Sequence, residues 1–248
     1  MINEHVEELL LKNRKTYHSL YFALCNITNP EIPEKYLLDL LHPDEICCSK
    51  YISSPQAHLN FYLSHISAKR AFMQWKPQEP ANQINLLHGS FSQPYMSCHS
   101  IQNLSISITH CHNIGVSVSF SEEYLIGIDL EKQEERINRV VSKLLTNQER
   151  QIQNDLSTNC TIASTVLWTA KEALSKALKI GFFADMKIYE INNAVYNSGY
   201  IVSSFRFFPQ FKAYSVPVKD FVFTVVLPYE LEPFDFHKTI TNLFAKLL

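Results

Sequence analysis

The feature that most constrains this chain is a stretch, residues 124–131, that combines an apolar run with two carboxylates. The run is typical of a buried strand. Side chains at i and i+2 of a strand share a face, so Asp129 and Glu131 point the same way while Ile128 and Leu130 point into the core. The sequence therefore predicts a buried strand that presents two acidic groups on one face.

A second constraint comes from residues 161–179, whose apolar side chains fall at helical spacing. A polar stripe adjoins the apolar one, and in it Glu172 and Lys176 are neighbours one turn apart. The stripe consists of Thr165, Thr169, Glu172 and Lys176. If this helix packs on the strand at 124–131, three carboxylates converge beside one lysine.

Converging carboxylates need a compensating charge. Two like charges about 4 Å apart repel by roughly 4 kcal/mol at an effective dielectric near 20. A hard divalent cation relieves this repulsion, and oxygen ligands without His or Cys suit Mg²⁺, which takes further ligands from substrate phosphates. The spacing alone therefore supports the hypothesis of a magnesium–phosphate site, with the lysine as a phosphate contact.

The two stretches together resemble the signature pair of the 4′-phosphopantetheinyl transferases. Residues 126–131 match the pattern (V/I)-G-(V/I)-D-x-E, and about forty residues later residues 168–176 match (F/W)-(S/C/T)-x-K-E-(A/S)-x-x-K. These enzymes move the phosphopantetheine arm of coenzyme A to a serine of an acyl or peptidyl carrier protein and release 3′,5′-ADP. Each half of the pattern alone is weak evidence for this family, but the two halves in this order and at this separation are specific for it.

The resemblance implies roles for the signature residues. Asp129, Glu131 and Glu172 are expected to hold Mg²⁺, with Mn²⁺ as an alternative, on the pyrophosphate of coenzyme A. Lys176 is expected to neutralise that pyrophosphate. For Lys171, a solvated side chain and a ligand contact are both open, and the alternative for Glu172 and Lys176 is a surface i,i+4 pair.

Two interpretations are open for Glu149. In the family, a glutamate in an F-S-x-x-E-like motif is a candidate base for the attacking serine, and here Leu145 and Thr146 replace Phe and Ser. The same residues also form a capping box, in which Thr146 caps a helix and Glu149 reaches back to its backbone. The two roles of Glu149, as catalytic base and as helix cap, are given equal weight.

The resemblance also implies contacts to coenzyme A, and these are less complete. Thr109 and His110 lie in a segment similar to the family's S-I-S-H-S, and Lys69 keeps a basic place in a helix whose usual leading Arg is Asn60 here. Gln93 replaces the Lys of a G-x-x-G-K-P segment. Both departures remove positive charge expected to bind the 3′-phosphate.

Strands and helices alternate without a regular βαβ rhythm, which favours an α+β fold. Helices are expected at 33–41, 56–76, 133–145, 161–179 and 235–248. A further short helix is expected to begin at residue 146, and residues 1–20 are expected to contain the start of a helix. Strands are expected at 21–27, 103–109, 115–120, 124–131, 187–193, 199–208, 212–216 and 221–227. Residues 86–94 are expected as a turn-rich link, and 110–113 as a turn.

The resemblance adds a domain organisation. Longer members of the family consist of two similar halves related by a pseudo-two-fold, with the coenzyme A site between them, and are monomers. A boundary near Glu123 would make residues 1–123 the nucleotide half and residues 124–248 the half with the signature and metal site.

Composition narrows the class of protein. The 248 residues, 46% hydrophobic and 19% charged, are typical of a globular protein, and a net charge of −2 excludes an overall basic nucleic-acid binder. The six cysteines form no C-x-x-C pair, the N-terminus lacks a signal-peptide pattern, and no apolar run reaches the roughly 18 residues of a membrane helix. We expect a cytoplasmic protein that contacts neither membranes nor nucleic acid.

Basic residues follow the first signature closely and would suit an acidic carrier protein. These residues are Arg136, Arg139, Lys143 and Arg150. An ordinary solvated helix face is an equally good interpretation. The carrier itself stays open among those of fatty acid, polyketide, siderophore and nonribosomal peptide synthesis.

Two rival functions share parts of this pattern. A magnesium phosphohydrolase would need the carboxylates but no carrier surface. A non-catalytic coenzyme A- or carrier-binding protein would fit the losses at Asn60 and Gln93. The intact set Asp129, Glu131 and Glu172 argues against such decay.

Overall fold

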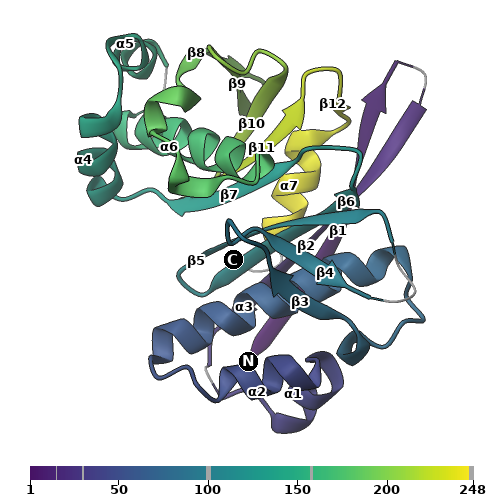
Figure 1. The fold of residues 1–248 in the computed structure, drawn as a ribbon. Coiled ribbons are helices and arrows are strands. Elements are labelled where there is room, and N and C mark those ends of the chain that lie inside the picture. The colour runs from purple at the N-terminus through teal and green to yellow at the C-terminus, as the bar shows by residue number, and fades with distance from the viewer. Residues whose placement is uncertain (15, 30, 99–101, 157–158, 246–248) are drawn as a thin grey trace. The chain divides into compact units, whose positions relative to one another are not determined.

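The computed structural model describes residues 1–14, 16–29, 31–98, 102–156 and 159–245. The chain divides into two compact units, each with its own sheet and helices (Figure 1). The first unit comprises Met1–Leu10, His18–Tyr124 and Thr241–Leu248, and the second comprises Leu11–Tyr17 and Leu125–Ile240. This arrangement confirms a mixed α+β fold with two sheet-containing parts.

The first unit has an antiparallel sheet in the order β1-β2-β6-β5 and a separate pair, β3-β4. The longest helix described in this unit is α3, which packs on β5 and β6 of the same unit. Its strands are β1 (Ile2–Asn13, whose last residues belong to the second unit), β2 (Thr16–Ile27), β3 (Asn85–His88), β4 (Pro94–Ser97), β5 (Leu104–Cys111) and β6 (Ile114–Ser121). Its helices are α1 (Glu34–Leu40), α2 (Pro43–Ser49) and α3 (Pro55–Phe72).

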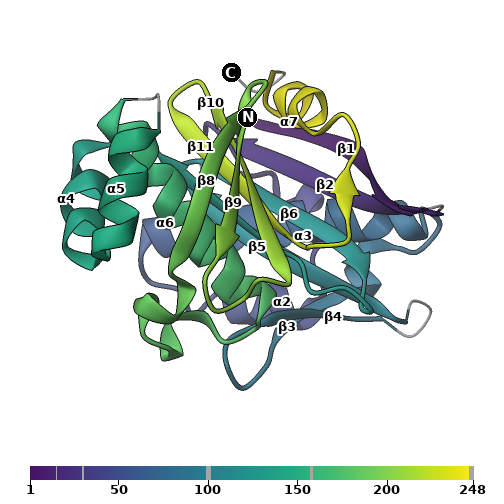
Figure 2. The same ribbon diagram turned by 90° about the horizontal axis from the view of Figure 1, so that it is seen from above.

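The second unit has a sheet in the order β7-β11-β10-β9-β8, on which α6 packs. In Figure 2, α6 lies between these strands and the helices α4 and α5, both of which contact it. The strands are β7 (Gly127–Lys132), β8 (Ile191–Asn197), β9 (Tyr200–Phe205), β10 (Phe211–Val218), β11 (Phe221–Pro228) and the short β12 (Glu232–Pro233). The helices are α4 (Glu135–Leu144), α5 (Asn147–Asp155), α6 (Cys160–Ala177) and α7 (Phe236–Ala245), whose last turns belong to the first unit.

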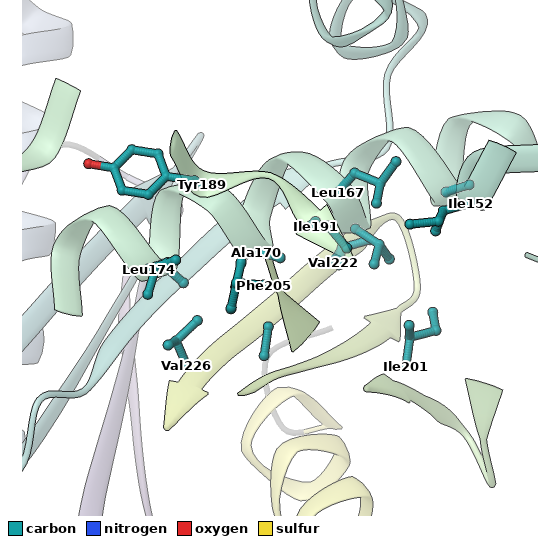
Figure 3. Packing of buried hydrophobic residues seen from close by; sticks show 14 of the residues in the cluster. Ile152, Leu167, Ala170, Leu174, Tyr189, Ile191, Ile201, Phe205, Val222 and Val226 are labelled. Atoms are coloured by element: carbon teal, nitrogen blue, oxygen red, sulfur yellow. The ribbon is translucent and has the colours of Figure 1, made fainter. Parts of the chain in front are cut away.

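The core of the second unit is formed between α6 and the sheet (Figure 3). Leu167, Ala170 and Leu174 of α6 are fully buried, as are Val222 and Val226 of β11. Interdigitation of these apolar side chains fixes α6 on the strands. The helix therefore has a defined rotation, which decides where its polar residues point.

The predicted strand at 124–131 and the predicted helices at 133–145, 146 onward and 161–179 are confirmed within a few residues by β7, α4, α5 and α6. Most of the other predicted strands and helices are present too, with shifted ends. The helix predicted near the C-terminus is α7 as far as Ala245, and residues 246–248 of that prediction lie outside the described residues.

Three predictions of local structure were wrong. Residues 2–13 and 16–20 lie in strands and not in a helix start; alternate residues such as Leu9 and Leu11 are buried, and Leu11 pairs with Pro233 of β12. The link at 86–94 carries most of β3, paired with β4. His110 and Cys111 continue β5, so the turn begins at His112, whose φ of 54° is left-handed.

None of the six cysteines, all of which lie in described segments, forms a disulfide. Among the helices of the described residues, none is long and apolar enough to span a bilayer.

Candidate functional site

Gly127 brings β7 and α6 close together. A Cβ at this position would overlap the backbone of Ala173 and Ala177 on α6. Only glycine permits this approach. The strand therefore passes next to the helix just before Asp129, which explains the glycine of the signature in purely steric terms.

Asp129 lies on β7 opposite Thr224 of β11 and is only 4% exposed. Its Oδ1 accepts a hydrogen bond from Lys176 Nζ on α6 at 2.7 Å. As predicted, Ile128 and Leu130 are buried on the other face. The two signature stretches are thus joined by a charged hydrogen bond.

Glu172 lies one turn before Lys176 on α6 and is 7% exposed. Burial, together with the charges of Asp129 and Glu131, raises the pKa of Glu172 to about 8, and Lys176 acts in the opposite direction. The charges of Asp129 and Glu131 therefore act on Glu172. A site where negative neighbours favour a proton on Glu172 also favours a bound cation.

The donor set fits Mg²⁺ because it offers carboxylate oxygens without His or Cys. Within the described part of the chain, however, no three acidic, His or Cys side chains are gathered closely enough to hold one ion. In this arrangement the cation beside Asp129 is the ammonium group of Lys176. The carboxylates are near one another, and side-chain rotation would be needed to bring them onto a metal.

Glu149 is completely buried, and both of its carboxylate oxygens accept hydrogen bonds. Its Oε2 accepts the backbone N–H of Thr146 at 2.9 Å, and its own N–H donates to Thr146 Oγ1 at 3.3 Å. Its Oε1 accepts the N–H of Ile191 at 2.9 Å, and Lys171 Nζ lies 2.7 Å from Oε1 and 2.9 Å from Oε2. The capping box is therefore present, and the prediction of Glu149 as a base is untested by these contacts.

Lys171 is only 2% exposed, so the interpretation of a solvated lysine is wrong. Its side chain turns away from the solvent to reach Glu149. Sequence analysis missed this pairing because helical spacing gives the side of α6 on which Lys171 lies, but not the identity of the element packed there.

In the first unit, Lys69 is fully buried on α3. Its Nζ lies 2.8 Å from Glu45 Oε2 and donates to the carbonyl oxygens of Ala81, at 3.0 Å, and Ile84. Burial lowers the pKa of Lys69, and the charge of Glu45 opposes this shift. Glu45 was not singled out from the sequence, although His42 and Glu45 have the spacing of a capping box.

Thr109 and His110 are successive residues of β5, so their side chains point to opposite faces. Thr109 is 5% exposed, whereas His110 is exposed. Asn60 accepts a hydrogen bond from Gln56 on α3, and Gln93 accepts one from the backbone of Phe91. The two residues that replace family cations therefore take part in local hydrogen bonds.

Helix α4 exposes a face that is both basic and apolar. Arg136, Arg139 and Lys143 are exposed, as are Val140 (47%) and Leu144 (37%). These positions follow the i, i+3, i+4, i+7 spacing of one helix face.

Comparison with known proteins places the signature segment in a family. The model of the 4′-phosphopantetheinyl transferase superfamily matches residues 125–226. A crystal structure of holo-ACP-synthase from Plasmodium yoelii is similar over 48% of this chain and 96% of that chain, with 13% identity and a TM-score of 0.35. The search of curated proteins gave no match.

Proposed function

The chain carries a domain of the 4′-phosphopantetheinyl transferase superfamily at residues 125–226, and from this premise we propose that the protein transfers the phosphopantetheine arm of coenzyme A to a serine of an acyl or peptidyl carrier protein. The observation that carries the proposal is the grouping of Asp129, Glu172 and Lys176 on β7 and α6, inside the matched segment.

In the proposed reaction, the serine oxygen forms a bond to the β-phosphorus of coenzyme A and the bond from that phosphorus to 3′,5′-ADP breaks. Asp129, Glu131 and Glu172 would hold Mg²⁺, or Mn²⁺, which when bound neutralises the pyrophosphate. Lys176, which donates to Asp129 Oδ1, would donate to a phosphate oxygen in the complex with coenzyme A. The chain thus contributes positioning and charge stabilisation.

The family resemblance assigns further roles in this reaction. Thr109 and His110 would contact the phosphates of coenzyme A, and exposure of His110 supports its part in that role. For the serine proton, the resemblance leaves two alternative acceptors, Glu149 and a water molecule.

The face of α4 supports a carrier protein as the second substrate. Its exposed Arg136, Arg139 and Lys143 surround apolar Val140 and Leu144. A partner with acidic side chains around a small apolar patch would be complementary to this face. Carrier domains with an acidic helix are the corresponding partner class.

The organisation expected from the family stays a prediction: two similar halves related by a pseudo-two-fold, a boundary near Glu123 and a monomeric, cytoplasmic protein.

The test is intact-mass spectrometry of apo carrier proteins incubated with this protein, coenzyme A and Mg²⁺. The expected result is a gain of one phosphopantetheine, which is lost in Asp129→Ala and in EDTA but kept in Asp155→Asn, a change of an exposed carboxylate on α5. Release of phosphopantetheine into water would instead identify a phosphohydrolase. Binding of coenzyme A without transfer or hydrolysis on any carrier class would identify a binding protein.

A further inference from the structure

Each unit contains a glutamate–lysine ion pair that is removed from water. In the second unit the side chains of Glu149 and Lys171 are 0% and 3% exposed. In the first unit those of Glu45 and Lys69 are 3% and 0% exposed. Buried ion pairs are rare because each charge must be desolvated, so two in one chain call for a common explanation.

The two glutamates have the same local environment. Each is the third residue of a short helix, α2 or α5, and closes a capping box with the residue before that helix. Glu45 Oε2 accepts the N–H of His42 at 2.8 Å, and Glu149 Oε2 accepts that of Thr146 at 2.9 Å. The correspondence therefore extends to individual oxygen atoms.

The other glutamate oxygen binds the start of a strand in both units. Glu45 Oε1 accepts the N–H of Leu86 in β3 at 2.7 Å, and Glu149 Oε1 accepts that of Ile191 in β8 at 2.9 Å. Each carboxylate thus joins the start of a helix to the start of a strand.

The two lysines also correspond. Both lie on 18-residue helices, α3 and α6. Lys69 donates to the carbonyl of Ala81, and Lys171 donates to that of Met186 at 3.5 Å; each carbonyl belongs to the first residue of a 3₁₀-helix that precedes the strand just described.

Pairs of hydrogen-bonded hydroxyl groups show which residues of the two units correspond. Two residues before each lysine, Ser67 bonds Ser117 Oγ of β6 at 2.7 Å, and Thr169 bonds Thr224 Oγ1 of β11 at 2.6 Å. The same helix, strand, glutamate and lysine arrangement therefore occurs twice in the chain.

The site carboxylates, in contrast, occur once. Ser117 is paired across the sheet with Ala23, in the place where Thr224 is paired with Asp129. By the same register Cys25 takes the place of Glu131. On the helix, Arg70 follows Lys69 where Glu172 follows Lys171, and it binds Glu4. The first unit thus keeps the glutamate–lysine pair without the acidic site.

From this comparison we infer that Glu149 and Lys171 form a structural staple that positions α6, and with it Glu172, and that Glu149 is not the base of the reaction. Glu45 and Lys69 form the matching staple of the first unit, so Lys69 does not contact coenzyme A. The catalytic part of this inference rests on the proposed function, whereas the structural part does not.

Chemistry supports the same assignment. A general base must come within hydrogen-bond distance of the proton it removes. Both oxygens of Glu149 already accept from backbone N–H groups and from Lys171. To reach a serine, Glu149 would have to leave Lys171 buried with an uncompensated charge, which is strongly destabilising.

Thermal unfolding of two matched sets of variants tests the structural part: Glu149→Gln, Lys171→Met and the double variant, and Glu45→Gln, Lys69→Met and the double variant. Removing one partner leaves the other charge unpaired, so each single variant should lower the midpoint by about 10 °C. Each double variant should recover at least half of that loss, because both charges are then absent. If the decreases in midpoint of the two single variants simply add in the double variant, the proposed structural staple is refuted.

Transfer kinetics test the catalytic part. Glu149→Gln/Lys171→Met should recover kcat to within several-fold of the wild-type value, whereas loss of a general base would leave kcat lower by about 10²- to 10⁴-fold. Glu45→Gln/Lys69→Met should leave the KM for coenzyme A unchanged, and a rise of tenfold or more would restore Lys69 as a phosphate contact.

A third readout separates positioning from stability. At a temperature where both are folded, Glu149→Gln should raise the half-saturating Mg²⁺ concentration several-fold, because the turn carrying Glu172 is no longer fixed. Glu45→Gln, with a similar loss of stability, should not. Equal Mg²⁺ dependence of the two variants would refute the positioning role. If the wild-type protein transfers nothing, the proposed function fails, while the unfolding experiment still decides on the staple.

Discussion

Replacing Glu172 by Gln should change how the stability of the metal-free protein depends on pH. Burial and the charges of Asp129 and Glu131 raise the pKa of Glu172 from 4.5 to about 8, against the effect of Lys176. One pKa unit corresponds to about 1.4 kcal/mol, so complete ionisation of Glu172 in the folded state costs at most about 5 kcal/mol of the free energy of unfolding.

The sign follows from the direction of the shift. A carboxyl whose folded pKa is raised favours the folded state at pH values below its unfolded pKa, and this contribution is lost as the pH rises from 4.5 to about 8. Gln at position 172 has no proton to lose. The two proteins should therefore be similarly stable near pH 5, and Glu172→Gln should be several kcal/mol more stable near pH 9.

Urea unfolding in EDTA at several pH values measures this difference directly. Asp155→Asn serves as the control, since Asp155 is exposed and the difference between this variant and wild type should be small throughout. Saturating Mg²⁺ should stabilise the wild-type protein more than Glu172→Gln. A stability difference between wild type and Glu172→Gln that stays constant with pH would refute the description of these carboxylates as one interacting cluster.

Three further predictions follow from the same contacts. Gly127→Ala should lower the unfolding midpoint measured by circular dichroism, because overpacking against the backbone of α6 costs about 1–3 kcal/mol or more; an unchanged midpoint would contradict the close approach. Mg²⁺ binding should release protons near pH 6.5, where Glu172 is largely protonated in the metal-free protein; calorimetry in two buffers of different ionisation enthalpy measures this, and identical heats would contradict it. Arg136→Glu/Arg139→Glu should lower kcat/KM for an acidic carrier by about tenfold at low salt and by less at high salt; an unchanged salt dependence would move the carrier surface away from α4.

The sequence predicted the strand and helix that carry the acidic residues because both have strong local patterns. The alternation in 124–131 and the helical spacing in 161–179 are formed by residues that pack on one another. It did not predict that Thr165 and Thr169 are fully buried. A polar stripe normally indicates a solvent-exposed face, whereas here the two threonines are buried and Thr169 has a hydroxyl partner, Thr224, on β11.

Predictions failed where structure depends on partners distant in sequence. Residues 2–13 contain Glu and Leu, which favour helices locally, yet they form β1, whose Leu11 and Lys12 pair with the distant β12. The buried partner of Lys171 is 22 residues away and that of Lys69 is 24 residues away. No local pattern indicates such a pair, and a lysine is normally expected at the surface.

The signature therefore contains residues of two kinds. Gly127 and Lys171 serve packing, since the glycine admits α6 and the lysine is held by Glu149. Asp129, Glu131 and Glu172 strain the fold, because burial and the charges of neighbouring carboxylates together raise the pKa of Glu172. A chain that had lost its chemistry would still need the first kind in order to fold, whereas it would gain stability by losing the second. The glycine and the lysine are thus evidence of the fold, and the three carboxylates together favour a working site over a binding protein that has lost its activity.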